Sequence, residues 1–128
     1  MQRLGVIFLV LIGSVAQAQF TYTFDQSIPV ENTIGSLSLA WAGGLNSAQF
    51  NTIDLNGDNQ ADLVVYDRTA SRLQTFLRQE NRYVYAPEYE TQFPSQITHW
   101  MLLRDFDCDG RKDIFTSDPF GIQVFVNT

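Results

Sequence analysis

Two short stretches of the sequence carry oxygen-bearing side chains at a spacing that suits a metal ion. The first, Asp54–Asp62, reads DLNGDNQAD, and the second, Asp105–Asp113, reads DFDCDGRKD. Counted from the first Asp, both stretches carry Asp or Asn at positions one, three, five and nine. Calcium takes about six to eight oxygen ligands at roughly 2.3–2.6 Å, and a tight loop supplies them by turning alternate side chains inward. The spacing therefore predicts two calcium loops.

Each loop predicts a full ligand set. The side-chain ligands are Asp54, Asn56, Asp58 and Asp62 in the first loop, and Asp105, Asp107, Asp109 and Asp113 in the second. Gln60 and Arg111 stand at position seven, where only the backbone carbonyl is needed. Position six needs a positive φ, which Asn59 and Gly110 both tolerate. A solvated Asp-rich turn that binds nothing is the alternative, and the match of two loops at four positions argues against it.

The elements around these loops have the period of β-strands. Apolar and polar residues alternate in short runs separated by turn-forming clusters, and no stretch of ten residues shows helical spacing. Residues 70–82 are interpreted as strand, turn at Glu80-Asn81 and strand rather than as a helix. The expected strands are one into Asp54, residues 63–67, 73–77 and 82–86, one ending near Arg104, and residues 114–117 and 122–126. The chain is predicted to be all-β.

The two loops begin 51 residues apart, which indicates an internal repeat. An EF-hand loop shares the opening pattern, but it requires a carboxylate at position twelve and a helix on either side. Here position twelve is Val65 or Thr116, and strand-like sequence follows. The EF-hand is therefore disfavoured.

The sequence instead resembles the FG-GAP/VCBS repeat family, whose blades carry D-x-[DN]-x-D-G-x-x-D-L between two strands. The resemblance covers residues 41–128, as repeats of about 41–90 and 91–128, and includes the lead-in Ala42–Asn46. Gly57 and Asn59 depart from the family's D-G order. The resemblance implies β-propeller-type blades of four strands, with the calcium loop joining the first strand to the second.

About two blades fit into this length, and the second lacks its fourth strand. Propellers usually need four to eight blades. We expect a truncated reading frame in the first place, with assembly from copies or a partner and a small free-standing β domain as the alternatives.

The N-terminal 18 residues have the pattern of a signal peptide. Arg3 precedes an apolar run over Leu4–Ile12, and Ala16-Gln17-Ala18 supplies the small residues of a cleavage site. The run is too short for a membrane span of about 20 residues. A β segment over 19–40 is expected next, because residues 20–24 alternate aromatic and hydroxyl side chains. The protein is expected to be secreted, periplasmic or on the cell surface, where calcium is abundant.

The composition argues against several kinds of partner, site and activity. A formal net charge of −6 and a pI near 4.4 argue against a nucleic-acid partner. The chain has one Cys and one His, so neither a disulfide nor a Cys-rich zinc site can form within it. Cys108 is expected to be a surface thiol and His99 to be structural or exposed. No nucleophile is accompanied by a base and an orienting group, so no enzyme activity is expected.

Several aromatic side chains have two possible roles, as a sugar-binding platform or as packing between blades, and packing is the favoured interpretation. They are Trp41, Phe50, Tyr83, Tyr85, Tyr89, Phe93 and Trp100.

The expected function is a secreted calcium-binding repeat module in which Ca²⁺ has a structural role. As the resemblance suggests, it would serve adhesion to a protein or glycan at a cell surface or in the extracellular matrix. The alternative is an accessory propeller segment of a larger secreted enzyme, such as a hydrolase. A third reading is a compact β domain whose loops bind nothing.

Overall fold

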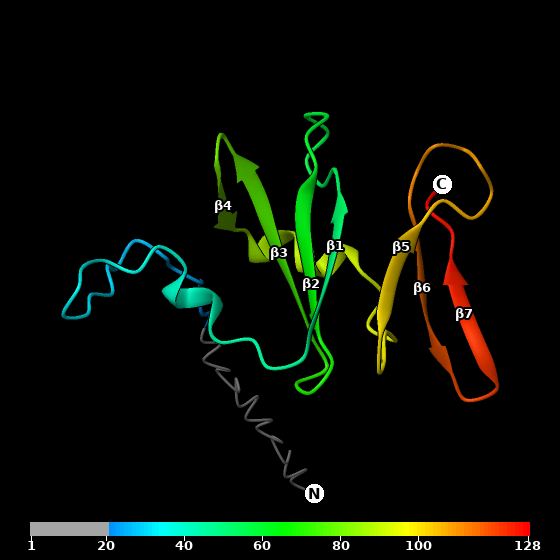
Figure 1. The fold of residues 1–128 in the computed structure, drawn as a ribbon, viewed down its shortest axis with the longest axis horizontal. Helices are drawn as coiled ribbons and strands as arrows, with labels where there is room; N and C mark the ends of the chain where they lie inside the picture. The colour runs from blue at the N-terminus through cyan, green and yellow to red at the C-terminus, as the bar shows by residue number, and fades with distance from the viewer. Residues whose placement is uncertain (1–20) are drawn as a thin grey trace, which may run out of the picture.

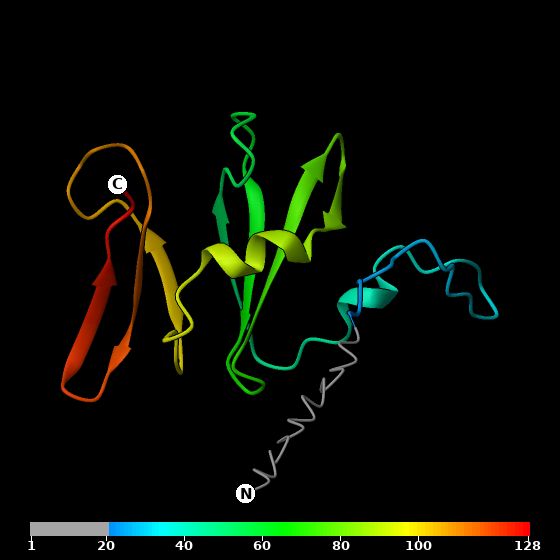
Figure 2. The same ribbon diagram turned by 180° about the vertical axis from the view of Figure 1, so that it is seen from behind.

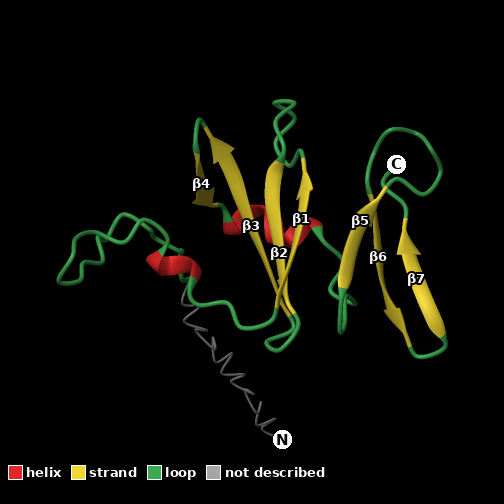
Figure 3. Ribbon diagram, viewed as in Figure 1, coloured by secondary structure: helices red, strands yellow, loops and turns green. Residues whose placement is uncertain are grey.

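A computed structural model describes residues 21–128 as two antiparallel sheets placed side by side (Figure 1). The expected signal peptide over residues 1–18 lies outside the described residues. In the described part, helix is confined to two short 3₁₀ segments, η1 (Ala40–Ala42) and η2 (Pro87–Gln92). The all-β prediction is therefore confirmed (Figure 3).

The first sheet has four strands in the order β1-β2-β3-β4. Their bounds are Ala48–Ile53, Asp62–Asp67, Arg72–Gln79 and Arg82–Tyr85. Consecutive strands pair throughout, so each connection is a local hairpin. The predicted turn at Glu80-Asn81 joins β3 to β4, and Glu80 has a positive φ of 55°. The strand–turn–strand interpretation of residues 70–82 is confirmed.

The second sheet has three strands in the order β5-β6-β7. Their bounds are Met101–Arg104, Asp113–Asp118 and Gly121–Phe125. The second sheet thus repeats the first three strands of the first sheet, as the incomplete second repeat predicts.

The main core lies between the two sheets. Val64 and Tyr66 of β2 pack against Met101 and Leu103 of β5, and Ile97 from the connecting segment closes the cluster. All five side chains are at most 8% exposed. Burying large apolar side chains stabilises the fold by about 1.5–3 kcal/mol each. This packing fixes the position of one sheet relative to the other.

Amide side chains of β1 connect the two sheets at their inner edges. Asn51 Oδ1 accepts a hydrogen bond from the Leu103 backbone N–H at 3.0 Å, and Gln49 Oε1 accepts one from Met101 N–H at 3.0 Å. These bonds satisfy N–H groups on the open edge of β5, which no strand within residues 21–128 covers. The connecting 3₁₀ segment η2 lies over β3, on the same side of the first sheet as the main core (Figure 2).

A second core lies on the opposite side of the first sheet. There Ala42 packs against Val65, Phe76 and Tyr85. The N-terminal segment therefore covers part of this face.

The expected β segment over 19–40 is not formed in residues 21–40, where the chain makes one isolated bridge, Glu31 to Ser36. Alternation gives a strand only where a second strand pairs with it. Instead, the ring of Phe24 packs edge-on against Tyr85 and Trp41, with centroids 5.8 and 6.5 Å away. Side-chain contacts hold this segment in place of a ladder. Among residues 21–128 no helix has the length and apolar character that crossing a bilayer requires.

Candidate metal centre

Both acidic loops connect the first strand of a sheet to the second. The first loop joins β1 to β2 and the second joins β5 to β6. They lie at the same end of the molecule, uppermost in Figure 1. The structure therefore brings the two predicted loops to one surface, separated only by the spacing of the sheets.

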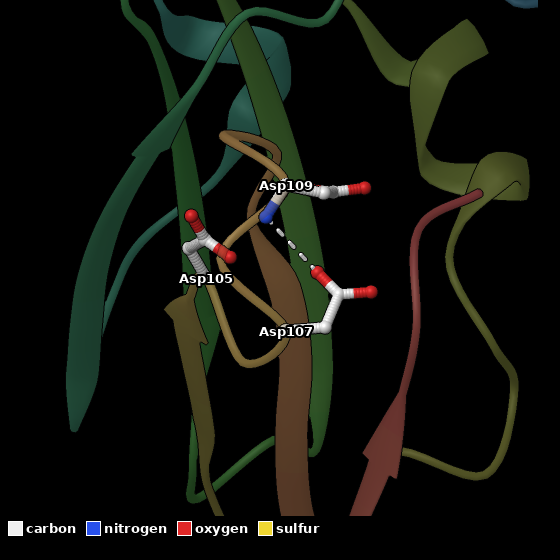
Figure 4. A group of neighbouring side chains, drawn as sticks. All are labelled: Asp105, Asp107 and Asp109. Carbon is white, nitrogen blue, oxygen red and sulfur yellow. Dashed lines mark hydrogen bonds between the residues drawn. The ribbon is translucent and has the colours of Figure 1, made fainter.

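In the second loop, three of the four predicted side-chain ligands form a compact group. Oxygen atoms of Asp105, Asp107 and Asp109 all lie within 4.8 Å of one another, and the three residues are exposed (Figure 4). Two oxygens bound to one calcium ion can be at most about 5 Å apart, because each Ca–O distance is roughly 2.3–2.6 Å. The group is thus already close enough to share one ion.

Backbone N–H groups hold these carboxylates in place. Asp105 accepts hydrogen bonds from the N–H groups of Cys108 at 2.7 Å and Gly110 at 3.0 Å. Asp107 accepts one from Asp109 N–H at 3.2 Å, which is the dashed line in Figure 4. Asp109 accepts one from Arg111 N–H at 2.7 Å. Each carboxylate therefore binds the backbone two to five residues later.

The first loop has the same network at the same positions. Asp54 accepts from Gly57 N–H and Asn59 N–H, both at 2.8 Å. Asn56 Oδ1 accepts from Asp58 N–H at 3.0 Å, and Asp58 accepts from Gln60 N–H at 2.7 Å. The repeat recognised from spacing therefore extends to individual hydrogen bonds.

The aspartate at position nine has a different environment from the other predicted ligands. Asp62 and Asp113 are both fully buried. One carboxylate oxygen accepts from the N–H at position two of its own loop, Leu55 at 2.8 Å or Phe106 at 2.6 Å.

The other oxygen of the position-nine aspartate accepts an N–H from the third strand of the sheet or the residues after it. The donor is Arg78 at 2.7 Å for Asp62 and Asn127 at 2.8 Å for Asp113. Each carboxylate thus ties the start of the loop to a distant part of the sheet. Because each oxygen still has a free lone pair, ion binding and this structural role are compatible.

Hydrogen bonding to the charged form favours ionised carboxylates at these sites. The N–H groups of Asn127 and Phe106 lower the pKa of Asp113 below its ordinary value, against the effect of burial. At Asp54 burial raises the pKa, but the N–H bonds from Asn59 and its neighbours outweigh it, so the net pKa is lowered. Asp54 and Asp113 are therefore anionic at neutral pH.

Two residues of each loop have left-handed backbone conformations. The predicted position six is confirmed, with φ of 63° at Asn59 and 90° at Gly110. Position four also has positive φ, 82° at Gly57 and 65° at Cys108. The first loop places its Gly at position four and the second at position six. The departure from the D-G order therefore leaves the loop geometry unchanged.

The position-seven residues contribute side chains as well as backbone. Arg111 forms an ion pair with Asp109, and its Nε donates to the Asn127 carbonyl at 3.0 Å. Gln60 Nε2 donates to Asp58 at 3.3 Å. Both side chains bind the carboxylate at position five, but only Arg111 carries a charge, so only the second loop partly neutralises its own negative charge in this way. The ligand spacing predicts a role only for the carbonyls of these residues and does not indicate this side-chain contact.

Lys112 is a further residue that the sequence reasoning missed. Its ammonium group donates to the carbonyl and the hydroxyl of Thr52, at the end of β1. It thereby connects the second loop to the first repeat. An open hollow of about 560 Å³ lies between the loops, with Asn59, Gln60, Gly110 and Lys112 among its lining residues. No short motif indicates this bridge, because its partners are 60 residues apart.

The predicted ligands in both loops are of the residue types that bind hard cations, which prefer oxygen donors. All predicted side-chain ligands are carboxylates or an amide, and the predicted sites contain neither His nor a thiolate at a ligand position. Cys108 is exposed and lies outside the carboxylate group, as expected of a surface thiol. This donor set fits calcium.

The aromatic side chains divide between core and surface. Tyr85 is 5% exposed and Phe93 packs against the main core, as the packing interpretation predicts. Phe50 is 64% exposed. His99 is exposed, and its Nδ1 lies 3.1 Å from the Ser117 hydroxyl.

Comparison of the chain with protein families, with characterised proteins and with solved structures gave no match. The functional argument therefore rests on the loops and their geometry.

Proposed function

We propose that this protein is a secreted calcium-binding repeat module that serves adhesion to a protein or glycan, with calcium in a structural role. The observation that carries the proposal is the duplicated loop. Two loops 51 residues apart share the same four ligand positions and the same hydrogen-bond network. Asp-rich turns arise by chance, but five backbone N–H bonds that recur at the same positions of two otherwise different loops indicate a shared requirement.

The ligands would be the side chains at positions one, three, five and nine and the carbonyls of Gln60 and Arg111. When bound, calcium supplies the positive charge that offsets the mutual repulsion of clustered carboxylates. The backbone N–H bonds fix Asp105, Asp107 and Asp109 before an ion arrives. Arg111 pairs with Asp109, so a bound ion would compete with the guanidinium group for this carboxylate.

The stacked sheets with their loops at one end are also the arrangement expected of consecutive blades in a β-propeller-type repeat. In such a module we place the protein or glycan partner at the hollow between the loops. Asp54, Gln60 and Lys112 are among the residues that line this hollow. Because both loops border the hollow, calcium binding would hold its shape. Secretion is proposed from the N-terminal 18 residues.

Thermal unfolding in calcium, in magnesium and in EDTA tests the calcium site. A ligand that binds only the folded state stabilises it by about 2.7 kcal/mol at a hundredfold excess over Kd. The expected result is a rise in Tm that is selective for calcium. The Asp107→Asn variant should show a smaller rise, because it loses a charged ligand and keeps the side-chain shape.

The matched control is Asp118→Asn, which changes an exposed aspartate at the opposite end of β6. Its calcium-dependent rise should equal that of the unmodified protein. A Tm that is the same in all three conditions would refute the calcium site. Binding to immobilised glycans or cell-surface proteins, compared with and without EDTA, then tests the adhesion function separately.

A further inference from the structure

The internal contact between the two sheets uses one particular face of each. On this face the first sheet has a row of directly paired residues across β1, β2 and β3, namely Asn51, Val64 and Thr75, of which Asn51 and Val64 contact β5. These are 9%, 0% and 0% exposed. The second sheet contributes Met101 and Thr116, which are paired and are 1% and 0% exposed.

The register of the second sheet reproduces the first of these faces on its outer side. Leu102, Phe115 and Val124 form a directly paired row across β5, β6 and β7. This row occupies the positions of Asn51, Val64 and Thr75, since both rows have their central residue three positions into the second strand. We call it, together with the neighbouring Ile122, the outer face.

The outer face is more apolar than its buried counterpart. Leu stands in place of Asn51, Phe in place of Val64 and Val in place of Thr75. Leu102 is nevertheless 38% exposed and Ile122 is 66% exposed, while Phe115 and Val124 are half-buried. The outer face is thus both more exposed and more apolar than the equivalent face of the first sheet, which is typical of an interaction surface.

The complementary surface is present at the other end of the same chain. Phe50 of β1 pairs with Val65, as Met101 of β5 pairs with Thr116, so Phe50 occupies the position of Met101. Met101 is 1% exposed in the internal contact, whereas Phe50 is 64% exposed. The N-terminal segment covers Val65 and leaves Phe50 open.

The segment that leads into β1 adds further exposed apolar side chains, as the segment that leads into β5 adds Phe93 and Ile97 to the internal contact. Leu39, Trp41 and Leu45 are 40%, 40% and 45% exposed. We call the side of the first sheet that exposes Phe50 the leading face.

We propose that the outer face binds the leading face of a second copy of this chain, and so continues the internal sheet-to-sheet contact head to tail. Both halves of the contact are on one chain, at opposite ends of the pair of sheets. Each half exposes apolar side chains at the positions whose equivalents are buried in the internal contact. The interface is heterologous, so association extends to a ring or a filament rather than stopping at a two-fold dimer. The proposal requires no metal and is independent of the proposed calcium site.

Sedimentation velocity of the purified protein over a range of concentrations tests the association. The weight-average mass is expected to rise above the monomer mass of 14.6 kDa as concentration increases. The Ile122→Glu variant should associate at least about tenfold more weakly, because it places a charge in the apolar contact. Phe120→Glu is the matched control, since Phe120 is 99% exposed in the β6–β7 turn and should associate normally.

A mixing experiment distinguishes head-to-tail contact from other arrangements. Phe50→Glu alone should also weaken association. When it is mixed with Ile122→Glu, one intact outer face meets one intact leading face, so a complex of two chains should form. Its formation also shows that both variants are folded.

Three results would overturn the proposal. The first is a monomer at every concentration, which would leave the outer face to a different partner or to further sequence. The second is association that persists in Ile122→Glu. The third is a mixture of the two variants that forms no complex although the unmodified protein associates, which would indicate a symmetric contact between identical faces.

Discussion

Within each acidic loop, the position-nine aspartate also holds the sheet together, whereas the other predicted ligands bond only within the loop. Asp62 is fully buried, and its two oxygens accept the N–H groups of Leu55 and Arg78 at 2.8 and 2.7 Å. Asp58 is exposed, and its bonds lie within the loop. Replacing each by Asn should therefore produce different effects on folding and on calcium binding.

The Asp62→Asn change keeps one acceptor oxygen and turns the other into a donor. One of the two backbone N–H groups then loses its acceptor and faces an N–H₂ group inside the protein. A buried unsatisfied donor costs about 1–3 kcal/mol, so we expect a loss of roughly 2 kcal/mol in the free energy of unfolding. For a domain of this size, that corresponds to a fall of about 8 °C in Tm.

Urea unfolding of both variants in EDTA and in excess calcium measures these effects. In EDTA, Asp62→Asn should lose the full amount and Asp58→Asn less than about 0.5 kcal/mol, as for most surface substitutions. In calcium, Asp58→Asn should fall behind the unmodified protein, because it loses a charged ligand. The reasoning would be refuted if Asp62→Asn were as stable as the unmodified protein in EDTA.

Three further predictions concern pH, packing and backbone strain. The N–H of Asn46 and those of other neighbouring residues lower the pKa of Asp67 in the folded protein. The stabilising effect of the Asp67 carboxylate is therefore complete above the ordinary Asp pKa of about 3.9, and it is lost as the pH falls through the lower folded-state pKa. Asp67→Asn should therefore reduce stability at neutral pH and flatten its decline below about pH 4, measured by urea unfolding across pH; an unchanged pH profile would contradict this assignment. Leu103→Ala should lower the free energy of unfolding by about 2–5 kcal/mol, because it opens a cavity between the sheets. Urea unfolding at neutral pH measures this loss, and a loss below about 1 kcal/mol would mean that the sheets do not pack as described. Cys108→Gly should raise the free energy of unfolding by about 0.5–1 kcal/mol, since Gly relieves the left-handed strain at φ 65°, whereas a loss of stability would show that the thiol makes a contact of its own.

Local residue types were sufficient to predict the strands and the loops. The period-two pattern placed β2, β3, β4, β6 and β7 to within about two residues, and the end of β5, because alternation and turn residues act over short distances. Loop spacing likewise predicted the positive φ at Asn59 and Gly110. Asx-type hydrogen bonds within nine residues need no information from elsewhere in the chain.

Contacts between distant segments were decided only by the tertiary structure. The partners of Asp62 and Asp113 in or beyond the third strand depend on strand register, which no loop motif encodes. The pattern at residues 21–24 predicted a strand, but no neighbouring strand pairs with it, and Phe24 packs against Tyr85 instead.

The repeat itself was visible in the sequence, whereas the faces that it leaves uncovered were not. Leu102 and Phe50 look like ordinary strand residues until the register aligns them with Asn51 and Met101. Exposure is a property of what lies opposite a side chain, and that is fixed by how the sheets stack rather than by the residue's neighbours in the chain.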